Sequence, residues 1–442
     1  MNRRVAVAVV ALVILGAIGY VVVRRLKGLR DTDTNIAVRQ AYRGPATMPV
    51  AVEDWPKWRG PRGDGISREK IAGTWPKDGP GLLWSADVGL GYSSPIAHQG
   101  KVYLFSMNDE HETLTCFDAH SGQILWSEED PEKGWTKSYP GTRATPAIHG
   151  DFIYTYGGAG NLSRRRLEAA DPKKGRLDWQ AFAMRLTSAV PIDWGQGSSP
   201  LVTDKHVYVQ GGIGGPVAIA FHHDGQVAWQ SEARGVGGYA APVLIDADGV
   251  GQLVVFGGEA IYGMDPLTGR TVWHVPWDTR FAVNAATPVY RDGHLFLTSE
   301  YGKGGIMIKV TGSGASTAWT APEVQGKFQP PILDGDALFV NSGGTVLCMK
   351  WPTPELYWTA SDPKLRLGVG GSIVRVGDKL ILLHERGILS LAKADENGIQ
   401  LVSQFTPTRG SQVWATPLVY GGRLYVKGET ELLCFDVSEP PQ

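Results

Sequence analysis

The sequence predicts an all-β chain in which eight four-stranded sheets close into a ring, and three observations support this prediction. A Trp recurs on one kind of strand, a Pro recurs before another kind, and the two ends of the repeated array complement each other. After an apolar run near the N-terminus, no long segment has the hydrophobic periodicity of a helix. The period of the repeats determines the fold.

The first repeated feature is a spacing of Asp, Gly and Trp. It is clear in "CFDAHSGQILW", "EAADPKKGRLDW" and "YGMDPLTGRTVW", which end at Trp126, Trp179 and Trp273. Looser copies, which keep the Trp but lose other positions, end at Trp229, Trp319 and Trp358. Each copy predicts a third strand, a tight turn at the Gly and a fourth strand that carries the Trp.

The second repeated feature is a Pro that follows small residues and opens an alternating hydrophobic run, as in "SSPIAHQGKVYLFS" and "ATPLVYGGRLYVKG". Eight positions are equivalent and lie 42 to 54 residues apart: Pro95, Pro146, Pro200, Pro242, Pro288, Pro331, Ile373 and Pro417. Each run predicts a first and a second strand. Four short strands in about 44 residues are typical of one blade of a β-propeller.

The ends of the array predict a closed ring. The last copy, which begins at Ala415, has three strands and lacks the fourth, whereas an unpaired fourth-strand segment, "GLLWSADVG" with Trp84, precedes the first copy. If Leu82 to Val88 completes the last blade, eight blades close without an open sheet edge. We therefore expect one eight-bladed domain over residues 81–437.

Composition agrees with this fold and excludes some functions. The chain has 57 Gly for tight turns, 15 Trp and 43% hydrophobic residues, which suffice for a large core. A net charge of −1 argues against nucleic acid as a partner. The three Cys, Cys116, Cys348 and Cys434, occupy the same third-strand position in different copies. This equivalence predicts packing between blades rather than a catalytic or metal-binding role.

The N-terminus contains an uncharged apolar run from Val5 to Val23. As a helix it would be about 28 Å long, close to the thickness of a bilayer core. We interpret residues 1–24 as a single-pass membrane anchor, although Ala17 and Gly19 also fit a cleaved signal peptide. Residues 25–54 then form a polar tether and residues 438–442 a tail. Residues 55–80 are a Gly- and Pro-rich lead-in that we expect to lie over one face of the ring.

The repeat spacing, the eight copies and the lead-in "WRGPRGDGIS" resemble the pyrroloquinoline-quinone-like (PQQ-like) β-propeller repeat proteins. This group contains the quinoprotein dehydrogenases and the propeller lipoprotein of the outer-membrane barrel assembly machinery, and the resemblance covers residues 55–436. It implies a bacterial envelope protein, anchored in the inner membrane with its propeller in the periplasm. The positive charges that follow the apolar run, from Arg24 to Arg30, favour the cytoplasm instead.

Candidate binding residues precede the landmark positions, where a propeller chain returns to the centre of the ring and surrounds one mouth of the channel. They are aromatic, amide or cationic: Tyr92, Arg143, Trp194, Gln196, Tyr239, Asn284, Gln329 and Trp414. Such groups could hold a flat polar ligand by stacking and hydrogen bonding, or form a peptide-binding rim. They could also plug the channel and hold the blades together.

The sequence therefore predicts a membrane-tethered, non-catalytic propeller that binds a protein, a peptide or a small ligand at the channel mouth. The alternative, implied by the resemblance, is a PQQ-dependent dehydrogenase of alcohols or sugars, which would need the quinone, Ca²⁺ and a carboxylate base. The adjacent Cys pair of many such enzymes is absent. Only Asp193 and the more distant Asp278 offer carboxylates near the mouth. We predict no catalytic and no metal-binding residue; Asp193 would be the base if the chain were an enzyme.

Overall fold

The structure, a computed structural model, describes residues 38–40, 52–169 and 175–439, the first three as backbone only. The predicted membrane anchor and most of the predicted tether lie outside these residues. Within the described ranges, no helix is both long and apolar enough to span a bilayer.

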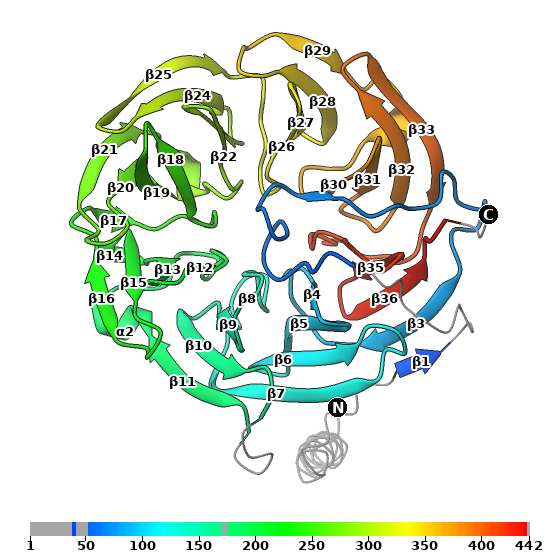
Figure 1. Cartoon of the computed structure of the whole chain (residues 1–442), viewed down its shortest axis with the longest axis horizontal. Helices are drawn as coiled ribbons and strands as arrows, with labels where there is room; N and C mark the ends of the chain where they lie inside the picture. The colour runs from blue at the N-terminus through cyan, green and yellow to red at the C-terminus, as the bar shows by residue number, and fades with distance from the viewer. Residues whose placement is uncertain (1–37, 41–51, 170–174, 440–442) are drawn as a thin grey trace, which may run out of the picture. The chain divides into compact units, whose positions relative to one another are not determined.

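Eight four-stranded antiparallel sheets surround a central channel, as the repeats predict (Figure 1). The innermost strands begin next to the landmark residues and are β4 (Ile96–His98), β8 (Ala147–His149), β12 (Leu201–Val202), β18 (Val243–Ala247), β22 (Val289–Arg291), β26 (Ile332–Asp334), β30 (Ser372–Val376) and β34 (Leu418–Tyr420). The second strands are β5 (Lys101–Asn108), β9 (Phe152–Tyr156), β13 (Val207–Gln210), β19 (Val250–Phe256), β23 (His294–Ser299), β27 (Ala337–Ser342), β31 (Lys379–Leu383) and β35 (Arg423–Lys427).

The two outer positions of each blade carry the Cys and Trp landmarks. The third strands are β6 (His111–Asp118), β10 (Asn161–Arg166), β15 (Ala218–Phe221), β20 (Ala260–Met264), β24 (Gly304–Thr311), β28 (Thr345–Lys350), β32 (Leu389–Asp395) and β36 (Glu431–Asp436). The outermost strands are β7 (Ile124–Lys133), β11 (Leu177–Phe182), β16 (Val227–Gln230), β21 (Thr271–Pro276), β25 (Gly314–Ala321), β29 (Leu356–Thr359), β33 (Gly398–Phe405) and β3 (Leu82–Asp87).

The ring closes through the N-terminal strand, as predicted. Strand β3 pairs antiparallel with β36, and Trp84 lies opposite Cys434. Strand β1 (Val38–Gln40), within the segment expected to be a tether, pairs with β3 as a fifth strand. Both ends of the chain therefore supply strands to the last blade, and the hydrogen bonds between β3 and β36 close the ring.

Four short elements depart from the repeat and were not predicted. Helix α2 (Ala183–Thr187) follows the second blade, and a two-stranded ribbon of β14 (Ile213–Pro216) and β17 (Arg234–Val236) extends from the third. Two 3-10 turns, η2 (Arg280–Ala282) and η3 (Pro363–Leu365), lie in connections between blades. None of these short elements has a hydrophobic period long enough to be distinguished from a loop.

The recurrence of Asp, Gly and Trp has a structural cause, because Trp84, Trp179 and Trp229 each donate a hydrogen bond to the turn of the next blade. Trp84 Nε1 donates a hydrogen bond to the carbonyl of Ala119, in the turn between the third and fourth strands of the first blade. That turn is capped by the Asp118 carboxylate, which accepts from the N–H of Ser121. A Cβ on Gly122, whose φ is +73°, would lie 2.5 Å from the Trp84 ring. The Gly is therefore required both by its backbone conformation and by the ring beneath it.

The three Cys occupy the position opposite a Trp on the neighbouring strand, in the pairs Cys116 with Trp126, Cys348 with Trp358 and Cys434 with Trp84. All three thiols are free and buried. Burial raises the pKa of Cys116 and of Cys348 to about 12, so both are neutral at physiological pH. Their surroundings are those of small hydrophobic residues packed between blades.

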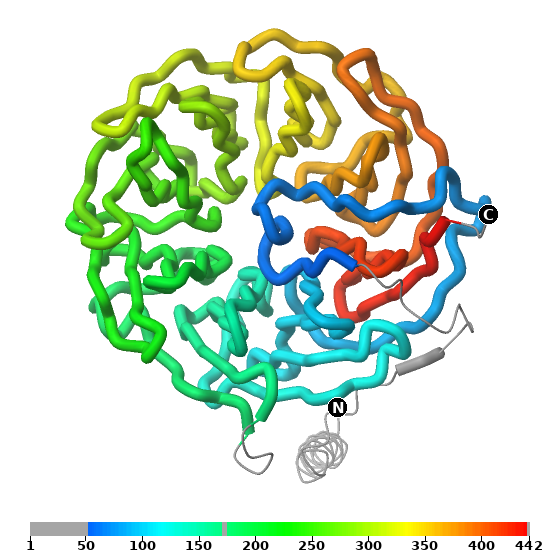
Figure 2. The backbone as a smooth tube through the Cα atoms, viewed as in Figure 1, coloured from blue at the N-terminus to red at the C-terminus, as the bar shows by residue number. Residues whose placement is uncertain are grey.

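The lead-in crosses the ring on the face that carries the turns between first and second strands (Figure 2). Trp55 pairs with Ala97 in the first blade, and the Arg59 guanidinium donates to the carbonyl of Pro331 at 2.8 Å. Strand β2 (Ile66–Ser67) then adds to β30 in parallel. The lead-in therefore contacts several blades and covers one end of the channel.

A further contact of the lead-in, made by Glu69, gives a first testable prediction. The Glu69 carboxylate accepts hydrogen bonds from the N–H groups of Gly421 and Gly422, at 2.6 and 2.8 Å, in the turn between β34 and β35. A neutral amide is a weaker acceptor than a carboxylate, so Glu69→Gln should lower the free energy of unfolding by about 1 kcal/mol in urea titrations. Glu355→Gln, at an exposed ion pair, is the matched control and should change it by less than about 0.5 kcal/mol. Equal effects of the two substitutions would contradict a role for Glu69 in fixing the lead-in.

Candidate binding site at the channel mouth

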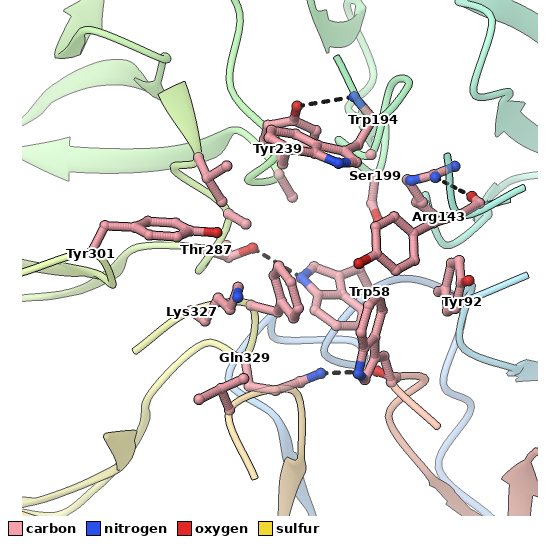
Figure 3. A pocket seen from close by; sticks show the side chains of 18 residues that line it. Trp58, Tyr92, Arg143, Trp194, Ser199, Tyr239, Thr287, Tyr301, Lys327 and Gln329 are labelled. Carbon is pink, nitrogen blue, oxygen red and sulfur yellow. Dashed lines mark hydrogen bonds between the residues drawn. The ribbon is translucent and has the colours of Figure 1, made fainter. Parts of the chain in front are cut away.

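A pocket with a volume of about 280 Å³ lies in the channel. Six of the eight predicted residues line it: Tyr92, Arg143, Trp194, Tyr239, Gln329 and Trp414. They come from different blades and surround one space (Figure 3). Each precedes an innermost strand, so this mouth is at the end of the channel opposite the turns that the lead-in contacts.

The other two predicted residues, Gln196 and Asn284, do not line the pocket and are fully buried. Gln196 Nε2 donates to the carbonyl of Gly211, and Asn284 Nδ2 donates to those of Gly257 and Trp277. Both amides point into the loops because buried carbonyls there need donors. The sequence pattern placed them correctly along the chain but could not reveal the direction of their side chains.

The floor of the pocket is Trp58, which is not one of the eight predicted binding residues. Its Nε1 donates a 3.0 Å hydrogen bond to Thr287 Oγ1, just before the innermost strand of the fifth blade. The ring lies amid the other lining side chains (Figure 3). The lead-in thus contributes a side chain to a pocket that is otherwise lined by residues of the ring. The second Trp of "WPKWRG" was the signal available in the sequence.

Two aromatic walls face each other across the pocket. On one side Trp414 contacts Tyr92, Phe328 and Tyr139, with ring centroids 4.9, 5.1 and 5.5 Å apart. On the other, the ring centroids of Trp194 and Tyr239 lie 6.3 Å apart, and the backbone N–H of Trp194 donates to the Tyr239 hydroxyl. Tyr139, Tyr301, Lys327 and Phe328 were not predicted, because they lie in loops whose approach to the channel has no sequence signature.

Arg143 is the cation at the centre of the first wall. Its guanidinium donates to the backbone carbonyls of Gly141, Ser138 and Tyr139 and lies 5.7 Å from the Tyr92 ring centroid. Burial lowers the pKa of Arg143 to about 10, which still leaves it charged at physiological pH. In the part of the chain that the structure describes, no carboxylate forms an ion pair with it.

Glu112 lies behind this wall and is fully buried. Its Oε1 accepts a 2.8 Å hydrogen bond from the Gly158 N–H, while its Oε2 has no partner among the described residues. Burial raises the pKa of Glu112 to about 7, against the lowering effects of the Gly158 and Trp135 N–H groups and the Arg143 charge. Glu112 therefore changes its charge within the physiological pH range, and it does so near Arg143, which lines the pocket.

The pocket does not offer the donor set that a Ca²⁺-assisted quinone requires. Ca²⁺ takes six to eight oxygen ligands, usually with several carboxylates, whereas no Asp or Glu lines the pocket. Asp193 is exposed and outside the lining, and Asp278 is paired with Lys303 at 3.2 Å. Within the described ranges, no group of three or more His, Cys, Asp or Glu side chains is arranged to hold a metal ion.

The PQQ-repeat family model described as outer membrane protein assembly factor BamB matches residues 74–193, 185–360 and 261–440. No curated protein matches the chain in sequence.

Solved structures share the fold. BamB from Moraxella catarrhalis superposes with a TM-score of 0.53 at 16% identity, covering 77% of this chain and 97% of that one. Sqt1 from Saccharomyces cerevisiae gives 0.54 at 10% identity, covering 83% and 100%. Quinohemoprotein alcohol dehydrogenase from Comamonas testosteroni gives 0.49 at 13% identity, covering 88% and 81%. At these identities the likenesses to BamB and Sqt1 establish the fold alone.

Proposed function

The chain belongs to the PQQ-like repeat family of BamB, and from this premise we propose that it is a non-catalytic binding module of the bacterial envelope. Its ligand-binding surface is the aromatic pocket at the channel mouth. The observation that carries the proposal is the lining of the pocket: two aromatic walls and the Arg143 guanidinium, which forms no ion pair among the described residues, with no carboxylate in the lining. Such a lining supports recognition by stacking and charge more readily than proton abstraction.

We place the propeller in the periplasm, tethered to the inner membrane by the apolar run from Val5 to Val23. The length of the run and the family support this location. The tether would leave the pocket accessible to proteins of the envelope. The Moraxella catarrhalis relative is named as BamB, and the family description refers to outer-membrane protein assembly. This description favours a protein partner over a small metabolite.

A crosslinking experiment tests the partner. A photoreactive residue at Tyr139, which is 41% exposed at the pocket, should capture one specific envelope protein in living cells. The control position, Leu356, is 42% exposed on β29, away from the pocket, and should give no such product. Capture should disappear when Arg143, Tyr239 and Trp414 are all replaced with Ala. If that triple variant instead fails to fold, these residues plug the channel, and the proposal is wrong.

The second candidate function is a quinone-dependent dehydrogenase. It is favoured by one observation, the flat aromatic pocket with Arg143 and Lys327 as cations. Calorimetric titration with pyrroloquinoline quinone, with and without Ca²⁺, separates the two functions. Metal-dependent binding at micromolar concentration would support the dehydrogenase, and absence of binding would leave the partner-binding function.

A further inference from the structure

Arg143 forms no ion pair with any of the described residues, although another cation that lines the pocket does. Lys327, on the opposite side of the pocket, forms a 2.9 Å ion pair with Glu300. Arg143, by contrast, is held by three neutral carbonyls and belongs to none of the ion pairs among the described residues. Partial burial makes an uncompensated charge costly, and an anionic ligand would offset that cost.

Three aromatic residues at the channel mouth have a backbone conformation that bulky residues rarely adopt; Tyr139 and Tyr301 line the pocket, and Phe281 contacts Trp194 beside it. Tyr139, Phe281 and Tyr301 have φ values of +54°, +66° and +64°. They are also 41%, 51% and 37% exposed, so their rings gain little from burial. Such a conformation costs about 1–2 kcal/mol for a residue with a Cβ, and it is concentrated at functional sites. Three occurrences at one mouth indicate that the loops present these rings for contact.

The exposed rings form an apolar rim on both sides of the mouth, with Tyr139 next to Arg143 and Tyr301 across the pocket from it (Figure 3). Phe281 packs edge-on against Tyr301, with centroids 5.9 Å apart, and against Trp194, at 6.0 Å. Tyr139 packs against Trp414 on the opposite wall. A desolvating rim around a central charged residue is the arrangement found at protein-binding hot spots, where Tyr, Trp and Arg are enriched.

Building on the function proposed above, we propose that the mouth receives an acidic segment of a partner protein. One carboxylate of this segment pairs with Arg143, and apolar side chains on either side of it pack against Tyr139, Phe281 and Tyr301. Charge complementarity selects the anion. The rim favours a polypeptide over a compact anion. A ligand small enough to be enclosed in the pocket would leave the exposed parts of the rim rings in contact with water, whereas a polypeptide would cover them.

The test compares two tripeptides with blocked termini, Phe-Asp-Phe and Phe-Asn-Phe, titrated against the full chain in detergent and followed by Trp fluorescence. The acidic peptide should bind about tenfold more tightly, the ratio expected for one charge-assisted hydrogen bond. In Arg143→Gln this ratio should fall to about one, and Arg143→Lys should retain part of it. Arg185→Gln, which removes an exposed Arg outside the pocket lining, should leave the ratio unchanged.

Phe281→Gly separates the rim from the charge. It removes the ring and accommodates the positive φ, so it should weaken both peptides by about fivefold while the ratio between them stays the same. Urea titration of each variant identifies any loss of folding, and the conservative Arg143→Lys variant keeps the test valid if Arg143→Gln unfolds.

Three outcomes would overturn the inference. Equal binding of the two peptides would exclude the carboxylate, and no binding of either peptide up to millimolar concentration would exclude an acidic segment. Displacement of a bound peptide by equimolar pyrroloquinoline quinone, without Ca²⁺, would show that the anion site serves a small molecule. The proposed function fails separately, if Tyr139 captures no protein in the crosslinking experiment.

Discussion

Replacing Arg165 with Met is expected to lower the free energy of unfolding by about 3–5 kcal/mol, the largest effect of any substitution considered. The Arg165 side chain is 1% exposed and forms an ion pair with Asp130, whose side chain is completely buried. Arg165 also donates to Thr155 Oγ1 at 3.3 Å, and Asp130 accepts from Ser163 Oγ. The pair joins β7 of the first blade to β10 of the second. Removing the cation leaves a buried carboxylate without its counter-charge.

The double variant Arg165→Met, Asp130→Leu shows whether charge or packing causes the loss. With both charges absent, most of the lost stability should return, because apolar groups of similar volume replace buried ion pairs at little cost. Urea unfolding of the wild type, the two single variants and the double variant gives the coupling energy. Arg185→Met, at an ion pair with both partners exposed, is the control and should cost less than about 1 kcal/mol. A double variant as unstable as Arg165→Met would attribute the loss to packing.

The fold could be predicted from the sequence because the residues that recur in the repeats are those that make contacts between neighbouring blades. Gly122 of one copy and Trp84 of the preceding copy lie in different blades, yet both recur in the repeats because the Gly backbone packs against the Trp ring. The orphan strand with Trp84 likewise revealed the closure, since a fourth strand without a blade must pair with a blade that lacks one. Helix α2 and the ribbon of β14 and β17 belong to no repeat and could not be foreseen.

The binding site was only partly predictable, because position along the chain does not fix side-chain direction. Tyr92 and Trp414 line the pocket as expected, whereas Gln196, which also precedes an innermost strand, points into a loop to satisfy a carbonyl. Trp58 reaches the channel from outside the repeats. Phe281 reaches the rim in a backbone conformation that no residue pattern indicates.

The buried Glu112 should make stability depend on pH in a way that Glu112→Gln removes. Burial raises the pKa of Glu112 from 4.5 to about 7 in the folded chain. A carboxyl whose folded pKa is raised stabilises the fold fully below its unfolded pKa, and this contribution is lost as pH rises through the folded value. The shift corresponds to about 3 kcal/mol. The Gln variant should therefore gain about 3 kcal/mol relative to the wild type between pH 4.5 and pH 8.

The measurement is urea unfolding of both proteins across this range, since other titrating groups cancel in the difference. Glu355→Gln, an exposed pair with Lys350, is the control and should follow the wild type. Glu112 also acts through space on Arg143, so its ionisation above pH 7 should reduce the positive potential at the pocket. The wild type should then bind the acidic tripeptide less tightly at pH 8 than at pH 6, and the Gln variant should lose this difference. Parallel stability profiles for the wild type and Glu112→Gln would show that Glu112 keeps the same charge throughout, and would remove the link between pH and the anion site.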